Sequence, residues 1–208
     1  MKAYRLHAVG DIRYEDVPVP ECPPGWCLVQ VKASGICSSD IPRIFRKGTY
    51  HFPTIPGHEF AGIVAKAADG APPVGKKVGV FPLIPCRRCA YCRQGQYELC
   101  TDYDYIGSRR DGGFAEYAAV PAWNLIELED GVDPAEAAMM EPLAVSLHAV
   151  KRMDIRPGCD AGIIGTGMIA FAAAQWALQR GPGSVTVTGR SESKRKTAET
   201  MEGVRYTT

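Results

Sequence analysis

The stretch AGIIGTGMIAFAAAQWALQRGPGSVTVT, residues 161–188, decides the fold of the C-terminal part of the chain. A short apolar run, AGII, leads into the glycine-rich turn GTGMIA and an apolar helix, after which SVTVT has the β-branched composition of a second strand. Strand, helix and strand in this order form a βαβ unit with a parallel sheet. The sequence therefore predicts an α/β domain here.

The turn GTGMIA fits the dinucleotide-binding pattern G-x-G-x-x-[GA]. In that pattern Gly165 makes the tight turn, Gly167 allows a pyrophosphate to approach the backbone, and Ala170 replaces the third glycine. Because the motif follows a strand and opens a helix, it has the structural context that the pattern requires. We predict that Gly165, Gly167, Met168 and Ile169 bind an NAD(P) cofactor.

The end of the second strand indicates which cofactor is used. An NAD enzyme needs an acidic residue there to accept hydrogen bonds from the ribose, but residues 188–191 read TGRS. Without a carboxylate to repel a 2′-phosphate, and with Arg190 able to pair with it, NADP is favoured over NAD. Lys194 and the two basic residues after it add positive charge, or they form an ordinary solvated helix face.

Upstream, residues 2 to about 150 have a mostly β pattern of short runs separated by Pro and Gly, which predicts a barrel or a sandwich. The expected strands are residues 27–34, 60–67, 76–84 and 114–120. Residues 134–153 then carry apolar side chains at helical intervals, with Asp133 as a cap and Pro142 as a break between two helices.

The composition limits the function classes. The 208 residues carry a net charge of +1 and a hydrophobic content of 46%, which describes a soluble globular protein with a small-molecule partner and excludes a nucleic-acid or membrane footprint. No signal peptide is recognisable at the N-terminus, so we expect a cytoplasmic protein. After residue 188 one more helix and the approach to a third strand follow. We expect a fragment that lacks about 100 residues of a typical α/β domain.

Four of the eight cysteines lie in PCRRCAYCRQGQYELC, residues 85–100. Their spacing suits a tetrahedral zinc site that leaves no position for substrate and is therefore structural. An iron–sulfur cluster is the alternative. In ferredoxin motifs, however, the fourth cysteine lies beyond the local triplet and precedes a proline, whereas Cys100 precedes Thr101. Buried or disulfide-linked thiols fit poorly in an Arg- and Gln-rich loop of a cytoplasmic protein. We predict a structural zinc held by Cys86, Cys89, Cys92 and Cys100.

A second group of metal-ligating residues is spread along the chain. GHEFAG, residues 57–62, places His58 beside Glu59 between glycines, which permit a close approach of the backbone. Alone, this pair equally fits a loop histidine beside a solvated glutamate. Cys37 in SGICSSD lies among small polar residues, unlike a core cysteine. Cys, His and carboxylate make three ligands and leave one position open, which is the form of a catalytic zinc site.

These motifs, in this order, resemble those of the zinc-dependent medium-chain dehydrogenases, and the likeness covers essentially the whole chain. It rests on CSSD from residue 37, GHE from 57, the four-cysteine lobe, GSRRDGGFAEY from 107, EPL from 141 and GTG from 165. The resemblance implies a mixed fold: an N-terminal, mostly-β GroES-like barrel domain over residues 1–150, with a zinc lobe at about 84–102, and a truncated α/β Rossmann domain over residues 151–208.

Within the family the chain is most similar to polyol dehydrogenases of the sorbitol type. Sorbitol dehydrogenases usually carry histidine where this chain has Pro42, which favours the sugar-phosphate branch. The resemblance implies an alcohol dehydrogenase that passes a hydride from a polyol or a polyol phosphate, such as galactitol 1-phosphate, to NAD(P). It also implies a homo-oligomer when full length.

The resemblance assigns roles to particular residues. Cys37, His58 and Glu59 are expected in or near the first shell of the catalytic zinc, with Glu141 as a direct or water-mediated ligand. The alternative for Glu141 is an acidic residue that ends a helix before proline. Asp40 is expected to orient His58, as carboxylates commonly do for metal-bound imidazoles.

Ser39 matches the hydroxyl that relays the proton away from the substrate in the family. Several basic residues are candidates to hold a substrate phosphate, although for each alone a solvated surface charge is the commoner explanation. They are Arg43, Arg46, Lys47, Arg109 and Arg110.

Two other functions fit the same residues. The chain as given is alternatively a non-catalytic zinc-binding remnant, because its βαβ region is incomplete. Threonine dehydrogenases share much of the pattern, so an amino-alcohol substrate is the second alternative.

Overall fold

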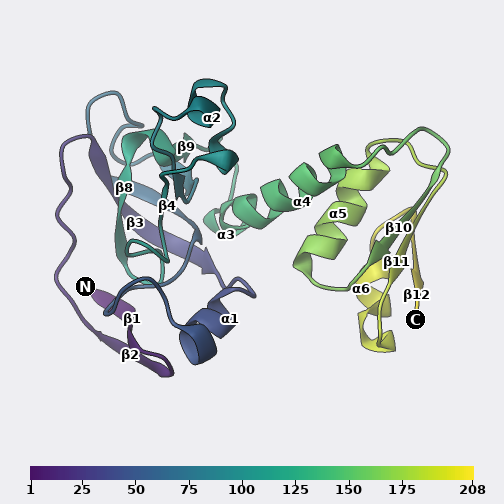
Figure 1. Cartoon of the computed structure of the whole chain (residues 1–208), viewed down its shortest axis with the longest axis horizontal. Helices are drawn as coiled ribbons and strands as arrows, with labels where there is room; N and C mark the ends of the chain where they lie inside the picture. The colour runs from purple at the N-terminus through teal and green to yellow at the C-terminus, as the bar shows by residue number, and fades with distance from the viewer. The chain divides into compact units, whose positions relative to one another are not determined.

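A computed structural model describes residues 1–208 of the chain, which form two compact units, Met1–Glu141 and Pro142–Thr208. The boundary between the units falls inside a helix and earlier than the division at residue 150 that the sequence led us to expect. Figure 1 shows the elements of both units along the chain.

The first unit is built on a five-stranded antiparallel sheet with the strand order β8-β3-β4-β5-β9. Its strands are β3 (Trp26–Gly35), β4 (Glu59–Lys66), β5 (Lys77–Val80), β8 (Tyr117–Pro121) and β9 (Leu125–Glu127). Two antiparallel pairs flank it: β1 (Lys2–Ala8) with β2 (Asp11–Asp16), and β6 (Leu83–Ile84) with β7 (Asp104–Tyr105). Single bridges from Ala3 to Ala115 and from Leu6 to Thr54 join β1 to the rest of the unit.

Short helices occupy the connections of this unit. They are α1 (Asp40–Pro42), the π-helix η1 (Arg43–Lys47), α2 (Ala90–Arg93), and the 3-10 helices η2 (Tyr97–Leu99) and η3 (Ala122–Asn124). The first two follow β3, and the next two lie in the cysteine-rich connection between β6 and β7.

The core of the first unit follows the two-residue period of its strands, because alternate side chains of a strand point to the same face. Each pair of buried positions is separated by one residue: Cys27 and Val29 in β3, Val78 and Val80 in β5, and Ala118 and Val120 in β8. In β4 Phe60 and Val64 are buried in the same cluster, with a glycine midway between them.

The run KKVGVFPLI, which we expected to be one strand, is divided into β5 and β6. Asn124 explains the division. It is fully buried, and its side-chain amide donates hydrogen bonds to the carbonyls of Phe81 and Leu83, both at 2.7 Å. Because these carbonyls on either side of Pro82 bond to a side chain, the chain leaves the sheet there without burying unpaired groups.

The helical region was predicted correctly at its start and wrongly at its break. Asp133 caps α3 (Pro134–Ala138) in a capping box with Glu136. The helix ends at Ala138 with Met139 as its C-cap residue, and α4 (Met140–Arg152) begins directly after Met139. Pro142 does not break a helix. It lies in the first turn of α4, where a missing backbone N–H costs nothing because that group has no intrahelical partner.

The second unit contains a three-stranded parallel sheet in the order β10-β11-β12, as the sequence predicted for its first two strands. The strands are β10 (Asp160–Ile164), β11 (Ser184–Thr188) and β12 (Val204–Thr207), and the connections contain α5 (Met168–Leu178), the 3-10 helix η4 (Glu192–Lys194) and α6 (Arg195–Glu199). Val185 and Val187 of β11 are fully buried beside Ala174 and Ala177 of α5. No helix of the chain combines the length and apolar character needed to cross a membrane.

Candidate metal centres and cofactor loop

Cys37, His58 and Glu59 come from two segments that the pairing of β3 with β4 brings together. The register places Gly35, the last residue of β3, opposite Glu59, the first residue of β4. Cys37 lies just beyond the end of β3, and His58 lies just before β4. Their ligand atoms all lie within 4.8 Å of one another, with His58 and Glu59 buried and Cys37 half-buried.

Glycines shape this cluster, but only partly in the way we expected. Gly57 has a φ of +97°, and a Cβ there would lie 2.4 Å from the Phe114 ring. A Cβ at Gly62 would lie 2.1 Å from the Gln30 carbonyl oxygen, so this glycine serves the approach of two strands. The residue that leaves room for the carboxylate itself is Gly35, where a Cβ would lie 2.5 Å from Glu59 Oε2.

Asp40 and His58 form a buried pair. Asp40 has no exposed surface, and its carboxylate accepts hydrogen bonds at 3.0 Å from the Cys37 backbone N–H and from Arg43 Nη1. Its Oδ1 lies 3.6 Å from His58 Nδ1, a buried atom that has no hydrogen-bond partner. A small rotation of the imidazole would let Nδ1–H donate to Asp40 and leave Nε2 as the donor atom for a metal.

The protonation state of His58 agrees with a metal site. Burial lowers the pKa of His58, and this effect outweighs the neighbouring Asp40 and Glu59, so the imidazole is neutral as a ligand must be. Burial likewise raises the pKa of the Cys37 thiol, which a bound cation would reverse. One thiolate, one imidazole and one carboxylate form a donor set that suits zinc and leaves a fourth position open. The residues present fit a catalytic zinc.

Glu141 lies beside this cluster rather than in it, since it is not among the atoms within mutual ligand distance. The Tyr105 hydroxyl donates a hydrogen bond to Glu141 Oε1 at 3.5 Å, and the Tyr105 ring lies edge-on to His58 with a centroid distance of 5.8 Å. Burial, followed by the charge of Glu59, raises the pKa of Glu141 to about 7. Tyr105 is a neighbour that the sequence did not predict, because nothing in YDYIG marks it as close to residues 58 and 141.

A cavity of about 310 Å³ opens beside the cluster. Ser39, the residue that precedes α1, lines it together with His58. The other lining residues are Arg43, Tyr50, Leu83, Glu98, Tyr103, Tyr105, Ser108 and Arg109. Of the five basic residues considered for a substrate phosphate, only Arg43 and Arg109 line this space.

The four remaining candidate ligands, Cys86, Cys89, Cys92 and Cys100, lie in the connection between β6 and β7, and their sulfur atoms are within 4.8 Å of one another. None is in a disulfide. The sulfurs accept backbone hydrogen bonds: Cys86 N–H donates to Cys100 Sγ at 3.2 Å, and Cys92 N–H donates to Cys89 Sγ at 3.4 Å. Such bonds stabilise thiolates, and they lower the pKa of Cys89 to about 6. Four sulfur donors fit a closed zinc site.

The glycine-rich turn connects β10 to α5. Gly165 has a φ of +127°, which favours glycine, and its N–H donates to the Thr188 carbonyl at 2.8 Å. Gly167 is the N-cap residue of α5, and Met168 and Ile169 form the exposed first turn. The free N–H groups of this turn are suited to a phosphate.

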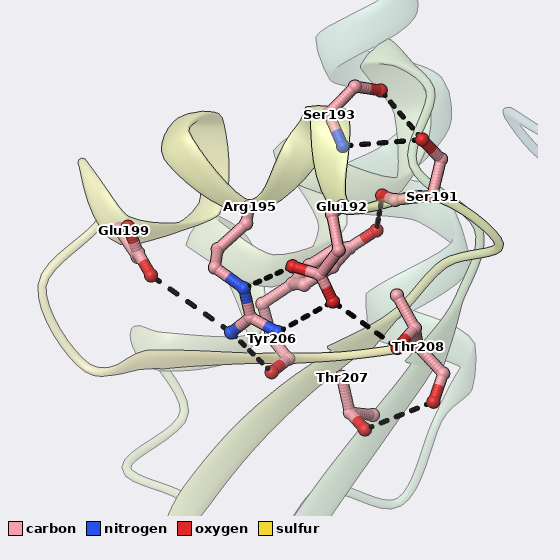
Figure 2. A network of polar contacts seen from close by, with 8 residues as sticks. All are labelled: Ser191, Glu192, Ser193, Arg195, Glu199, Tyr206, Thr207 and Thr208. Carbon is pink, nitrogen blue, oxygen red and sulfur yellow. Dashed lines mark hydrogen bonds and ion pairs between the residues drawn. The ribbon is translucent and has the colours of Figure 1, made fainter.

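At the end of β11 the basic residues differ in their partners. Arg190 is exposed and makes no ion pair, and Lys194 in η4 is also exposed and unpaired. Figure 2 shows that Arg195 is engaged: it pairs with Glu192 and Glu199, and its guanidinium lies 5.2 Å from the centroid of the Tyr206 ring. Arg195 thus has acidic partners within the chain, whereas Arg190 and Lys194 have none.

Comparisons with known proteins agree with this fold. The family described as "Alcohol dehydrogenase GroES-like domain" matches residues 23–130. The chain belongs to this family, that of the zinc-dependent medium-chain dehydrogenases, and the predicted fold class is confirmed.

The curated relatives include galactitol 1-phosphate 5-dehydrogenase of Escherichia coli strain K12, which is 40% identical over 200 residues, covering 93% of this chain and 57% of that protein. Sorbitol dehydrogenase of Bacillus subtilis strain 168 is 33% identical over 208 residues, covering 97% of this chain and 59% of the relative. The chain thus spans less than two thirds of either relative.

Among solved structures, one described as a zinc-binding dehydrogenase from Sinorhizobium meliloti 1021, bound to NADP, superposes with a TM-score of 0.93 at 36% identity. The match covers 99% of this chain and 61% of that structure.

Proposed function

We propose that this protein is a zinc-dependent alcohol dehydrogenase that oxidises a secondary hydroxyl of a polyol or polyol phosphate, of the galactitol 1-phosphate type, and passes the hydride to NADP or NAD. The observation that carries the proposal is the cluster of Cys37, His58 and Glu59 beside a cavity that Ser39 also lines. The names of the relatives support the substrate class.

The chain's residues divide the work in this proposal. Cys37, His58 and Glu59 hold the zinc, and Asp40 keeps the imidazole oriented through the contact described above. Zinc bound there supplies Lewis-acid chemistry, which makes a hydroxyl easier to deprotonate. Ser39 takes the proton from the substrate hydroxyl and passes it toward solvent. Glu141, which accepts a hydrogen bond from Tyr105, is a further zinc ligand that binds directly or through a water molecule.

The two parts of the chain serve different partners. Residues 1–150 act as the catalytic domain, in which the lobe at about 84–102 is fixed by a structural zinc. Residues 151–208 belong to the cofactor domain, where Gly165, Gly167, Met168 and Ile169 bind the pyrophosphate. We further propose a homo-oligomer, which sedimentation of the purified protein tests.

NADP is the preferred cofactor in this proposal. No carboxylate follows β11 directly, and Glu192 nearby is held by Arg195. Arg190 is left to pair with a 2′-phosphate. Substitution R190A should raise KM for NADP about tenfold and leave KM for NAD within twofold, because one charge-assisted contact is lost. K194A serves as the neighbouring control.

The proposed chemistry is tested by turnover. Purified zinc-loaded protein is assayed with galactitol 1-phosphate, galactitol, sorbitol and threonine, each with NADP and with NAD. We expect polyol-dependent reduction of the cofactor that S39A lowers about 100-fold in kcat without loss of zinc, since a proton relay contributes on the order of 10²–10⁴. S38A is the matched control. Turnover of threonine alone, or none with any alcohol, would reject the proposed function.

A further inference from the structure

Arg109 is held in a fixed position at the cavity beside the metal cluster. It follows β7 in a tight turn: its N–H donates to the Tyr105 carbonyl at 2.9 Å, and Gly107 N–H donates to the Arg110 carbonyl at 2.8 Å. His51 Nε2 lies 3.0 Å from the Arg109 carbonyl and ties the turn to a second segment. The point from which the side chain extends is therefore rigid.

The side chain is fixed by aromatic rings rather than by a carboxylate. The central guanidinium carbon lies 4.3 Å from the centroid of the Tyr50 ring and 4.4 Å from that of the Tyr103 ring. Stacking of this kind orients the planar group and leaves its charge uncompensated. Nε is buried without a hydrogen-bond partner, and Nη1 has only a long contact of 3.4 Å to the Tyr103 carbonyl.

The other basic residues near the cavity are paired with a carboxylate or do not line it. Arg43 pairs with the buried Asp40 at 3.0 Å. Arg110 pairs with Asp104 and stacks on Trp26. Arg46 and Lys47 do not line the cavity. Glu98 also lines it, but as an exposed side chain that makes no ion pair with Arg109.

We propose that Arg109 binds the anionic end group, phosphate or carboxylate, of the polyol whose hydroxyl lies at the end of the cavity with Ser39 and His58. A guanidinium with unpaired donors recognises either oxyanion by two parallel hydrogen bonds. This inference rests on the proposed function for the rest of the substrate. It implies that specificity is determined by the charged end of the substrate, which a single arginine binds.

The test compares R109Q with R110Q, a matched change at the neighbouring arginine. Wild type and both variants are given galactitol 1-phosphate, galactonate and neutral galactitol. R109Q should raise KM at least about tenfold for the preferred anionic substrate, with kcat and the constants for galactitol changed less than threefold, while R110Q behaves as wild type. Which anion loses more identifies the natural end group. R109K should lie between wild type and R109Q, because it keeps the charge and loses the planar fork.

Binding is measured separately from turnover, by calorimetric titration of each compound into the zinc-loaded protein without cofactor. If no alcohol is oxidised but anion binding is weakened tenfold by R109Q alone, the proposed function fails and the role of Arg109 stands. The role of Arg109 is overturned if wild type binds neither anion more tightly than galactitol, or if R109Q and R110Q weaken anion binding equally. Should R109Q lose its native circular dichroism, the same comparison is made with R109K.

Discussion

The two candidate metal clusters of the first unit are built in opposite ways. Cys86 to Cys100 lie in one connection, offer four sulfurs and are bound to one another through backbone hydrogen bonds. Cys37, His58 and Glu59 meet only because β3 and β4 pair, and they offer three unlike donors beside a cavity. The closed, local cluster is suited to holding the fold together, and the open, non-local one to binding a substrate.

The largest expected effect comes from a substitution that removes a ligand of the open cluster. C37A should reduce activity by at least about 10³-fold, because the Lewis acid is lost with its ligand. The melting temperature should fall by less than about 3 °C, since the half-buried thiol contributes little packing. Initial rates and thermal unfolding are measured side by side, with C22A as the control. A C37A variant that keeps more than a tenth of the activity would contradict the assignment.

The closed cluster should respond in the reverse sense. C92A should destabilise the protein by at least about 3 kcal/mol, because structural zinc binding is worth on the order of 10 kcal/mol, and the melting temperature should fall by about 6–12 °C. Per folded molecule, activity measured well below the melting temperature should change far less than in C37A. Equal melting temperatures of C92A and wild type would show that the metal site of the lobe does not stabilise the fold.

A smaller effect is expected for Asp40, which lies beside His58 of the open cluster. D40N keeps the shape of the side chain but removes the charge beside His58 Nδ1, and it should lower activity by about 10–100-fold together with zinc affinity. Zinc titration with a competing chelator checks the affinity, and E21Q, at an exposed carboxylate outside the cluster, is the control. If D40N lost activity at unchanged zinc affinity, Asp40 would not act through the imidazole.

The smallest effect is a pH dependence that only the open cluster should show. Without a cation there, burial raises the pKa of Glu141 to about 7 in the folded protein from an ordinary value of 4.5, so the folded state binds the extra proton between these values. Stability should therefore fall as pH rises from about 4.5 to about 7 in a C37A background. Denaturant unfolding of C37A and C37A/E141Q across this range measures the slope, which the second substitution should reduce. Identical slopes would mean that Glu141 is solvated.

The same contrast explains what the sequence could predict. The cysteine lobe and the capping of α3 by Asp133 are local, so spacing alone located them. The meeting of Cys37 with His58 depends on the register of β3 against β4, which residue patterns do not give, and here the family resemblance supplied the expectation. Gly35, Tyr105 and the rings around Arg109 are also non-local and were missed. The break expected at Pro142 was wrong. From sequence alone, a proline in the first turn of a helix cannot be distinguished from a proline that follows the end of a helix.

We propose that one chain holds two zinc ions in two independent clusters. The most direct measurement is the zinc content of purified protein by elemental analysis, for wild type, C37A and C92A. We predict two zinc ions per chain in wild type, about one in C37A with the lobe still folded, and loss of the lobe ion in C92A. One zinc per chain in wild type, unchanged by C37A, would contradict the account.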